Sequence, residues 1–263
     1  MDSVFNSSTT AQIDAKLYRD TLNYQYRLEK ITIVSVIVLM FMFRGWIAYW
    51  LKFGIAIPSG FTNSEISLIN DPVQKNYSKD LQKAKTFTYK SLISKTKVEL
   101  IPQAHYTLSG RVVAFNHDFL LTKGYFDKSA LYDLGATWGK DMSEPQFFKK
   151  YFKIYSQKVE LTGSRILYWQ WKYDTPLTEQ YITSHISHTH IIPANNNVMA
   201  AMLKLKLYDK VKIEGELVDM KFTSHQGAIP QYTHTSLSRT DTEGSACETM
   251  YVTKVQIGNF IYK

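Results

Sequence analysis

The feature that most constrains this chain is a long apolar stretch near its N-terminus. Residues 31–43 carry no charged side chain, and after Arg44 and Gly45 the sequence continues as mostly apolar residues to Ala56. A helix needs about 20 mainly apolar residues to cross the hydrocarbon core of a bilayer. The sequence therefore predicts one transmembrane helix at residues 31–56.

Aromatic and charged residues beside this stretch give the predicted span a direction. Trp46, Tyr49 and Trp50 have the composition of an interfacial aromatic belt, which places the exit from the bilayer near residues 50–56. Basic residues gather on the N-terminal side, at Lys16, Arg19, Arg27 and Lys30. Because such residues tend to stay in the cytoplasm, we expect the N-terminus to be cytoplasmic and the C-terminal domain to be periplasmic. The localisation predicted from the sequence is a single-pass protein of the bacterial inner membrane.

The remainder of the chain has the composition of a folded, strand-rich domain. Aromatic residues make up 14% of the sequence, and rings of this kind favour half-buried strand faces. We expect an α+β protein in which the N-terminal transmembrane helix precedes a β-rich soluble domain with a few short helices, an OB-like barrel being one form of it. The expected divisions are a cytoplasmic polar helix at 1–30, the span at 31–56, a linker and lysine-rich segment at 57–97, and an extracytoplasmic β-rich domain at 98–263.

Local patterns predict several elements of this domain. Asn195 is a candidate N-cap for a helix in which Val198, Met202 and Leu205 form an apolar stripe, and this helix would plug one end of a barrel. The main strands are expected at 104–116 and 208–220, and a hairpin is expected to pair 151–157 with 164–173. Further helices are expected at 72–94, 128–133 and 144–151.

Three histidines near the middle of the chain form the first candidate site. His188 and His190 would lie on one face of a strand, where two imidazoles can share a metal ion, whereas His185 would lie on the opposite face. A metal site needs at least a third ligand, and no spacing in the sequence marks one. Ordinary half-buried histidines are the alternative interpretation.

A loop-like segment at 238–248 forms the second candidate site. It contains the only cysteine of the chain, which excludes an intrachain disulfide and a four-cysteine zinc site. A nucleophilic thiol needs a base, and His188, His190 or His234 could provide it if the fold brings one of them close. The catalytic candidates are Cys247, His190, Asp241, Arg239 and Glu248. The alternative is a loop held by an Arg–Asp pair around a small buried cysteine.

Familiar enzyme motifs are missing from the sequence. It contains no phosphate-binding loop, dinucleotide glycine fingerprint, HExxH motif or serine elbow, so we expect no cofactor. Lysines recur through residues 75–97 in a chain of net charge +8, which would suit an anionic lipid, a nucleic acid or an acidic protein. A solvated lysine face is the alternative, and a periplasmic location disfavours nucleic acid unless DNA is transported.

Three segments carry a resemblance to known sequences: DLGATWG at 133–139, HIIPAN at 190–195 and SRTDTEGSACE at 238–248. They resemble segments of uncharacterised bacterial single-span membrane-anchored proteins with a C-terminal β-rich domain, over roughly residues 105–256. This resemblance implies a bacterial origin and no particular activity. The layout of the N-terminal part is also similar to that of inner-membrane scaffold subunits of type IV secretion and conjugation machines.

The sequence thus leads to two hypotheses of function. The first is an envelope protein whose periplasmic domain binds partner proteins or acts as a scaffold, as in a secretion or conjugation complex. Its expected partners are the membrane and other envelope proteins, and a homo-oligomer is left open. The second is an anchored hydrolase that uses Cys247 with a histidine, or a metal ion held by His188 and His190.

Overall fold

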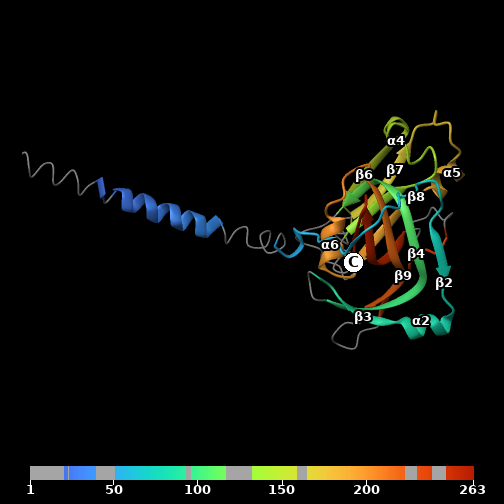
Figure 1. Cartoon of the computed structure of the whole chain (residues 1–263), viewed down its shortest axis with the longest axis horizontal. Helices are drawn as coiled ribbons and strands as arrows, with labels where there is room; N and C mark the ends of the chain where they lie inside the picture. The colour runs from blue at the N-terminus through green and yellow to red at the C-terminus, as the bar shows by residue number, and fades with distance from the viewer. Residues whose placement is uncertain are drawn as a thin grey trace, which may run out of the picture. The chain divides into compact units, whose positions relative to one another are not determined.

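The chain divides into two compact units, which consist of residues 1–50 and 51–263 (Figure 1). The structure is a computed structural model that describes residues 21–22, 24–39, 51–92, 96–116, 132–158, 165–222, 230–238 and 247–263. In the first unit, residues 24–39 are helical. All labelled strands and helices belong to the second unit.

The predicted transmembrane helix at 31–56 is wrong. Within the part of the chain that the structure describes, which leaves out residues 40–50, no helix is long and apolar enough to cross a membrane. At the far end of the predicted span, the helical residues stop at Phe53. Phe53 and Ala56 are only 2% and 5% exposed, and Ala56 belongs to the main core of the second unit.

This finding removes the predictions that depended on the span. The fold class with an N-terminal transmembrane helix, the inner-membrane localisation and the assignment of a cytoplasmic and a periplasmic side are all unsupported. The β-rich part, for which an OB-like barrel was one possible form, is a ten-stranded mixed sheet with a separate two-stranded hairpin.

Five strands of the large sheet close on themselves and form a ring (Figure 1). They are β4 (Lys97–Asn116), β5 (Tyr132–Thr137), β8 (Ile186–Pro193), β9 (Lys210–Phe222) and β11 (Glu248–Ile257). Strand β4 pairs with β5 and β9, β8 pairs with β5 and β11, and β11 also pairs with β9. Only the β8–β11 pairing in this ring is parallel. Closure leaves each of the five strands with a neighbour on both sides.

Shorter strands extend the ring at its margins. These are β1 (Gly60–Phe61), β2 (Val73–Asn76), β3 (Phe87–Lys90), β10 (Gln231–Thr233) and β12 (Phe260–Tyr262). The helix expected at 72–94 is largely wrong. Among the described residues of this segment, which leave out 93 and 94, only α2 (Lys79–Lys85) is helical. The Ser78 hydroxyl accepts a hydrogen bond from the Leu81 amide, and β2 and β3 on either side of the helix pair with β4.

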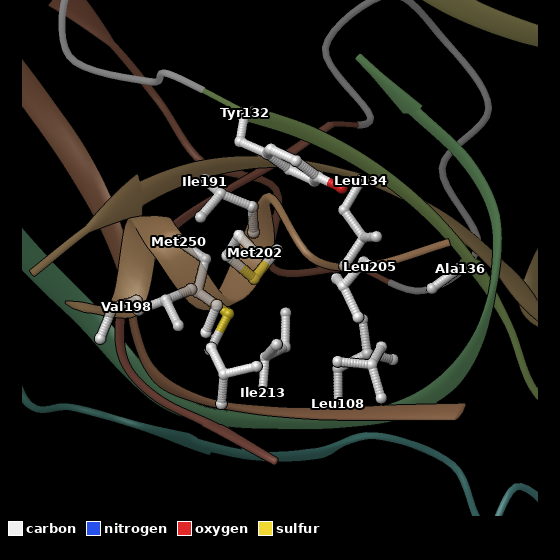
Figure 2. Close-up of a cluster of buried hydrophobic side chains, with 14 of the residues drawn as sticks. Leu108, Tyr132, Leu134, Ala136, Ile191, Val198, Met202, Leu205, Ile213 and Met250 are labelled. Carbon is white, nitrogen blue, oxygen red and sulfur yellow. The ribbon is translucent and has the colours of Figure 1, made fainter. Parts of the chain in front are cut away.

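The main core fills the inside of the ring. Figure 2 shows side chains of the strands, among them Leu108, Ile213 and Met250, gathered in one core with Val198 and Met202. The last two belong to α6 (Asn196–Met202), which confirms the predicted helix.

Helix α6 begins where the sequence predicted and ends earlier. The Asn195 side chain caps it by accepting a hydrogen bond from the Val198 amide at 2.9 Å. Although the helix stops at Met202, Leu205 still packs in the same core (Figure 2). The apolar stripe of the sequence thus runs past the helix itself.

A second layer packs on the outside of the ring. It contains α4 (Pro145–Tyr151), α5 (Glu179–Ser184) and the hairpin of β6 (Phe152–Lys158) and β7 (Arg165–Trp171). Their apolar side chains surround Ile186 at the start of β8. The predicted hairpin and the helix at 144–151 are confirmed.

The helix expected at 128–133 is wrong where it can be checked. Tyr132 and Asp133 begin strand β5, and residues 128–131 lie outside the described residues. Tyr132 is buried in the core inside the ring because the strand alternates apolar and polar side chains.

The outward face of β8 leads from this fold to the candidate site. Ile186, His188, His190 and Ile192 share that face because alternate strand residues point the same way. Ile186 belongs to the apolar cluster around α4 and α5, and Ile192 to another beside β3. The two histidines therefore lie between two outer apolar clusters.

Candidate functional site

The pairing of β5, β8 and β11 determines which side chains meet at the two histidines. In the antiparallel β5–β8 pair, Asp133 lies opposite His190. In the parallel β8–β11 pair, Glu248 lies opposite Thr189, so Cys247, which comes directly before β11, lies beside His188. Three strands distant in sequence thus form one cluster, composed of Asp133, His188, His190 and Cys247.

Distances within this cluster are those of direct polar contacts. The Cys247 Sγ lies 3.3 Å from His188 Nδ1, and the His190 Nδ1 lies 2.7 Å from an Asp133 carboxylate oxygen. The same oxygen lies 3.9 Å from His188 Nε2, which is too far for a hydrogen bond but close enough for electrostatic attraction. The two imidazole rings are 4.6 Å apart between centroids.

His188 is the most enclosed member of the cluster. It is 7% exposed, and its Nε2 is buried without a hydrogen-bond partner among the described residues. Burial acts to lower the pKa of His188, but Asp133 and Cys247 outweigh it and raise this pKa above its usual value. Burial likewise acts to raise the pKa of Asp133, yet the two histidines bring it below its usual value. The cluster therefore favours a carboxylate at Asp133 and makes the His188 imidazole a stronger base.

Glu248 does not join the cluster, although it follows Cys247 directly. Adjacent strand residues point to opposite faces, and Glu248 is buried with Thr189, whose hydroxyl lies 3.5 Å from a Glu248 carboxylate oxygen. This catalytic candidate thus faces the inside of the ring.

The remaining candidate residues lie away from the cluster or outside the described residues. His185 is not in the strand; it follows α5 and its ring stacks on that of Tyr181, with 3.8 Å between centroids. His234 pairs with Asp219 at 2.9 Å on the surface. Arg239 and Asp241 lie outside the described residues.

Asp133 is the member of the cluster that sequence reasoning missed. Its strand, with Tyr132, Leu134 and Ala136 buried inside the ring, has an alternation of apolar residues that a six-residue segment shows only weakly. The signal in the sequence was Asp133 itself, a polar residue between two apolar ones, which indicates that its side chain points outward. Its partner, His190, could not be identified in this way because it is 57 residues away in sequence.

The cluster contains donor atoms for two kinds of chemistry. A thiol in contact with an imidazole is the arrangement of an activated sulfur nucleophile. In addition, one donor atom from each of His188, His190 and Cys247 lies within 4.8 Å of the other two, so these residues could hold a metal ion. The sequence placed the two histidines on one face, and the structure adds Cys247 as the third donor.

Comparison with known proteins identifies no relative of this chain. No protein-family model, curated protein or solved structure matches it.

Proposed function

We propose that this protein is a thiol-dependent enzyme of the hydrolase or acyl-transfer class, with Cys247 as the nucleophile. The observation that carries the proposal is the 3.3 Å contact between the Cys247 Sγ and His188 Nδ1. Contact with a base is what a thiol needs in order to act as a thiolate at neutral pH. Asp133, on the far side of the His188 ring, supplies the negative charge that favours an imidazolium.

The proposed reaction has two steps. The Cys247 thiol transfers its proton to His188 Nδ1, and the thiolate attacks the carbonyl carbon of an ester or amide. The bond to the leaving group breaks, the leaving group takes the proton from His188, and a thioester remains on Cys247. Water, deprotonated by His188, then hydrolyses the thioester and regenerates the thiol.

The test uses the full chain, treated with a chelator, and p-nitrophenyl acetate as an activated ester. We expect a burst of one equivalent of p-nitrophenolate and an acetyl group on Cys247 by mass spectrometry. His188→Gln should slow acetylation by about 100-fold or more, the usual scale of general base catalysis. Cys247→Ser should abolish the thioester.

His234→Gln is the matched control, because His234 is exposed and pairs with Asp219 rather than with Cys247. This variant should react like the original protein. Acetylation of Cys247 at the rate of a small-molecule thiol, or an unchanged rate in His188→Gln, would exclude the proposed role. Circular dichroism of each variant separates loss of reactivity from loss of folding.

The binding or scaffold role expected from the sequence layout stays a prediction. It assumed a domain held at a membrane by a transmembrane helix, and that helix is not supported. No contact in the described residues favours a particular partner protein over the thiol chemistry.

A further inference from the structure

His190 is a member of the cluster that the proposed thiol chemistry leaves without a role. It lies on the same face of β8 as His188, and its Nδ1 contacts Asp133 at 2.7 Å. A carboxylate behind an imidazole fixes the ring's orientation and increases its basicity, which is the usual support for a metal-ligating histidine.

We propose that His188, His190 and Cys247 bind one Zn²⁺ ion, and that this ion blocks the thiol chemistry of Cys247. The proposal rests on the proposed function for what is blocked, but the binding of zinc stands independently of it. Two imidazole nitrogens and one sulfur form a donor set that suits zinc. The Cys247 sulfur would be bonded to the ion and could no longer attack a carbonyl carbon.

The spacing of the donors fits one ion after small side-chain movements. The three donor atoms all lie within 4.8 Å of one another. Bonds of about 2.0–2.3 Å to a tetrahedral Zn²⁺ place two ligand atoms about 3.3–3.6 Å apart. The donors therefore need to approach by roughly 1.5 Å at most, and rotation of the partly exposed Cys247 side chain could supply part of this.

The other nitrogen of the His188 ring also suits this coordination. Its Nδ1 faces Cys247, so an ion shared with the thiolate would be bound at Nδ1, and the ring proton would lie on Nε2. Nε2 is buried without a hydrogen-bond partner among the described residues and lies 3.9 Å from an Asp133 carboxylate oxygen, whose negative charge attracts that proton.

The charge balance of binding is simple. The Cys247 thiol and the His188 imidazole share one proton in the metal-free protein, and zinc binding releases that proton to solvent because both donors must be deprotonated to act as ligands. No oxidant or other co-reactant takes part.

The experiment measures zinc binding to the chelator-treated full chain by competition with a chromophoric chelator. We expect one Zn²⁺ per chain, and Co²⁺ in its place should give the intense near-ultraviolet absorption of a thiolate–metal bond. His190→Ala removes a direct ligand of the ion. It should therefore weaken zinc binding by at least about 100-fold, which is the largest loss usually seen when a residue that only supports a ligand is removed. His234→Ala is the matched control and should bind as the original protein does.

A second measurement does not depend on any variant folding. One equivalent of Zn²⁺ should protect Cys247 from iodoacetamide, and excess EDTA should restore alkylation. Absence of stoichiometric binding, binding without thiolate absorption, or equal affinity in His190→Ala would overturn the zinc site. Binding that leaves alkylation unchanged would overturn the blocking of the thiol. An unreactive Cys247 in the metal-free protein would instead count against the proposed enzyme function and leave the zinc result standing.

Discussion

At the scale of single residues, the site depends on which face of a strand each side chain occupies. Cys247 and Glu248 are neighbours, yet the first contacts His188 and the second is buried with Thr189. A shift of one residue in the β8–β11 register would exchange the two faces. The contact between Cys247 and His188 therefore depends on the register of the β8–β11 pairing.

Charged residues on the strands also make the stability of the protein depend on pH. The Glu214 carboxylate lies between two ammonium groups, 3.0 Å from Lys254 and 3.2 Å from Lys212. Partial burial acts to raise the pKa of Glu214, but the two lysines outweigh it and hold this pKa below its usual value. The ionised form is therefore favoured by folding.

We expect Glu214→Gln to lower the free energy of unfolding by about 0.5–1 kcal/mol at pH 7, the range of partly exposed ion pairs. A lowered pKa in the folded protein contributes stability above the unfolded value of about 4.3. The contribution is lost as the pH falls through the folded pKa. Urea unfolding should thus show a larger difference between the two proteins at pH 7 than at pH 3.

Glu65→Gln is the control for this pH dependence. Glu65 also contacts a lysine, Lys210 at 2.6 Å, but it is fully exposed, so no measurable change is expected at either pH. A difference between the original protein and Glu214→Gln that is equal at pH 7 and pH 3 would contradict the ionic explanation.

At the scale of elements, closure of the ring requires β9 to pass close to β11. Gly215 of β9 lies opposite Val252 of β11, next to a register shift between Val252 and Lys254. A Cβ atom on Gly215 would lie 2.0 Å from the carbonyl oxygen of Tyr251, a distance that no backbone atom can tolerate. A glycine inside a strand allows such a close approach of two backbones because it has no side chain.

Gly215→Ala should therefore force β9 and β11 apart and lower the free energy of unfolding by about 3 kcal/mol, at the upper end of overpacking costs. Gly60→Ala is the matched control, because the nearest atom to its added Cβ is 4.0 Å away. That variant should stay within about 0.5 kcal/mol of the original protein. Equal stability of the two alanine variants in guanidinium unfolding would show that the strands do not close as described.

At the scale of the whole molecule, residues 51–263 have their own core. The main core contains apolar side chains of β4, β5, β8, β9, β11 and β12, and Ala56 packs with them. Phe53, near the start of this unit, is 2% exposed. We therefore expect residues 51–263 to fold without residues 1–50.

This expectation is tested by expressing the fragment 51–263 and comparing its thermal unfolding with that of the full chain. Both should show the same cooperative transition, because the core is complete in each. Phe53→Ala in the fragment should cost about 3 kcal/mol by loss of a buried ring. A fragment without cooperative unfolding would contradict the independent folding of residues 51–263. An unaffected Phe53→Ala variant would show that Phe53 does not contribute to the core.

Elements with a strong local pattern could be predicted from the sequence. The 144–151 helix, the 151–173 hairpin and the start of α6 at the Asn195 cap agree with the structure, since turns and caps are determined by residues close in sequence. The apolar segment at 31–56 gave a wrong result. Burial inside a protein and burial in a bilayer select the same side chains, which accounts for Phe53 and Ala56 at the end of the segment. It does not account for Ile31 and Ile33, which are 62% and 58% exposed.

The sequence by itself thus determined the strand-rich character of residues 98–263, the common face of His188 and His190, and the presence of a single thiol. Only the tertiary structure decided that Cys247 contacts His188 and that Asp133 supports His190. These contacts join residues 57 and 59 positions apart in sequence, and they come from strand pairings that local patterns do not encode. Side-chain periodicity gives the face that a residue occupies, whereas its neighbours across the sheet depend on how the whole ring closes.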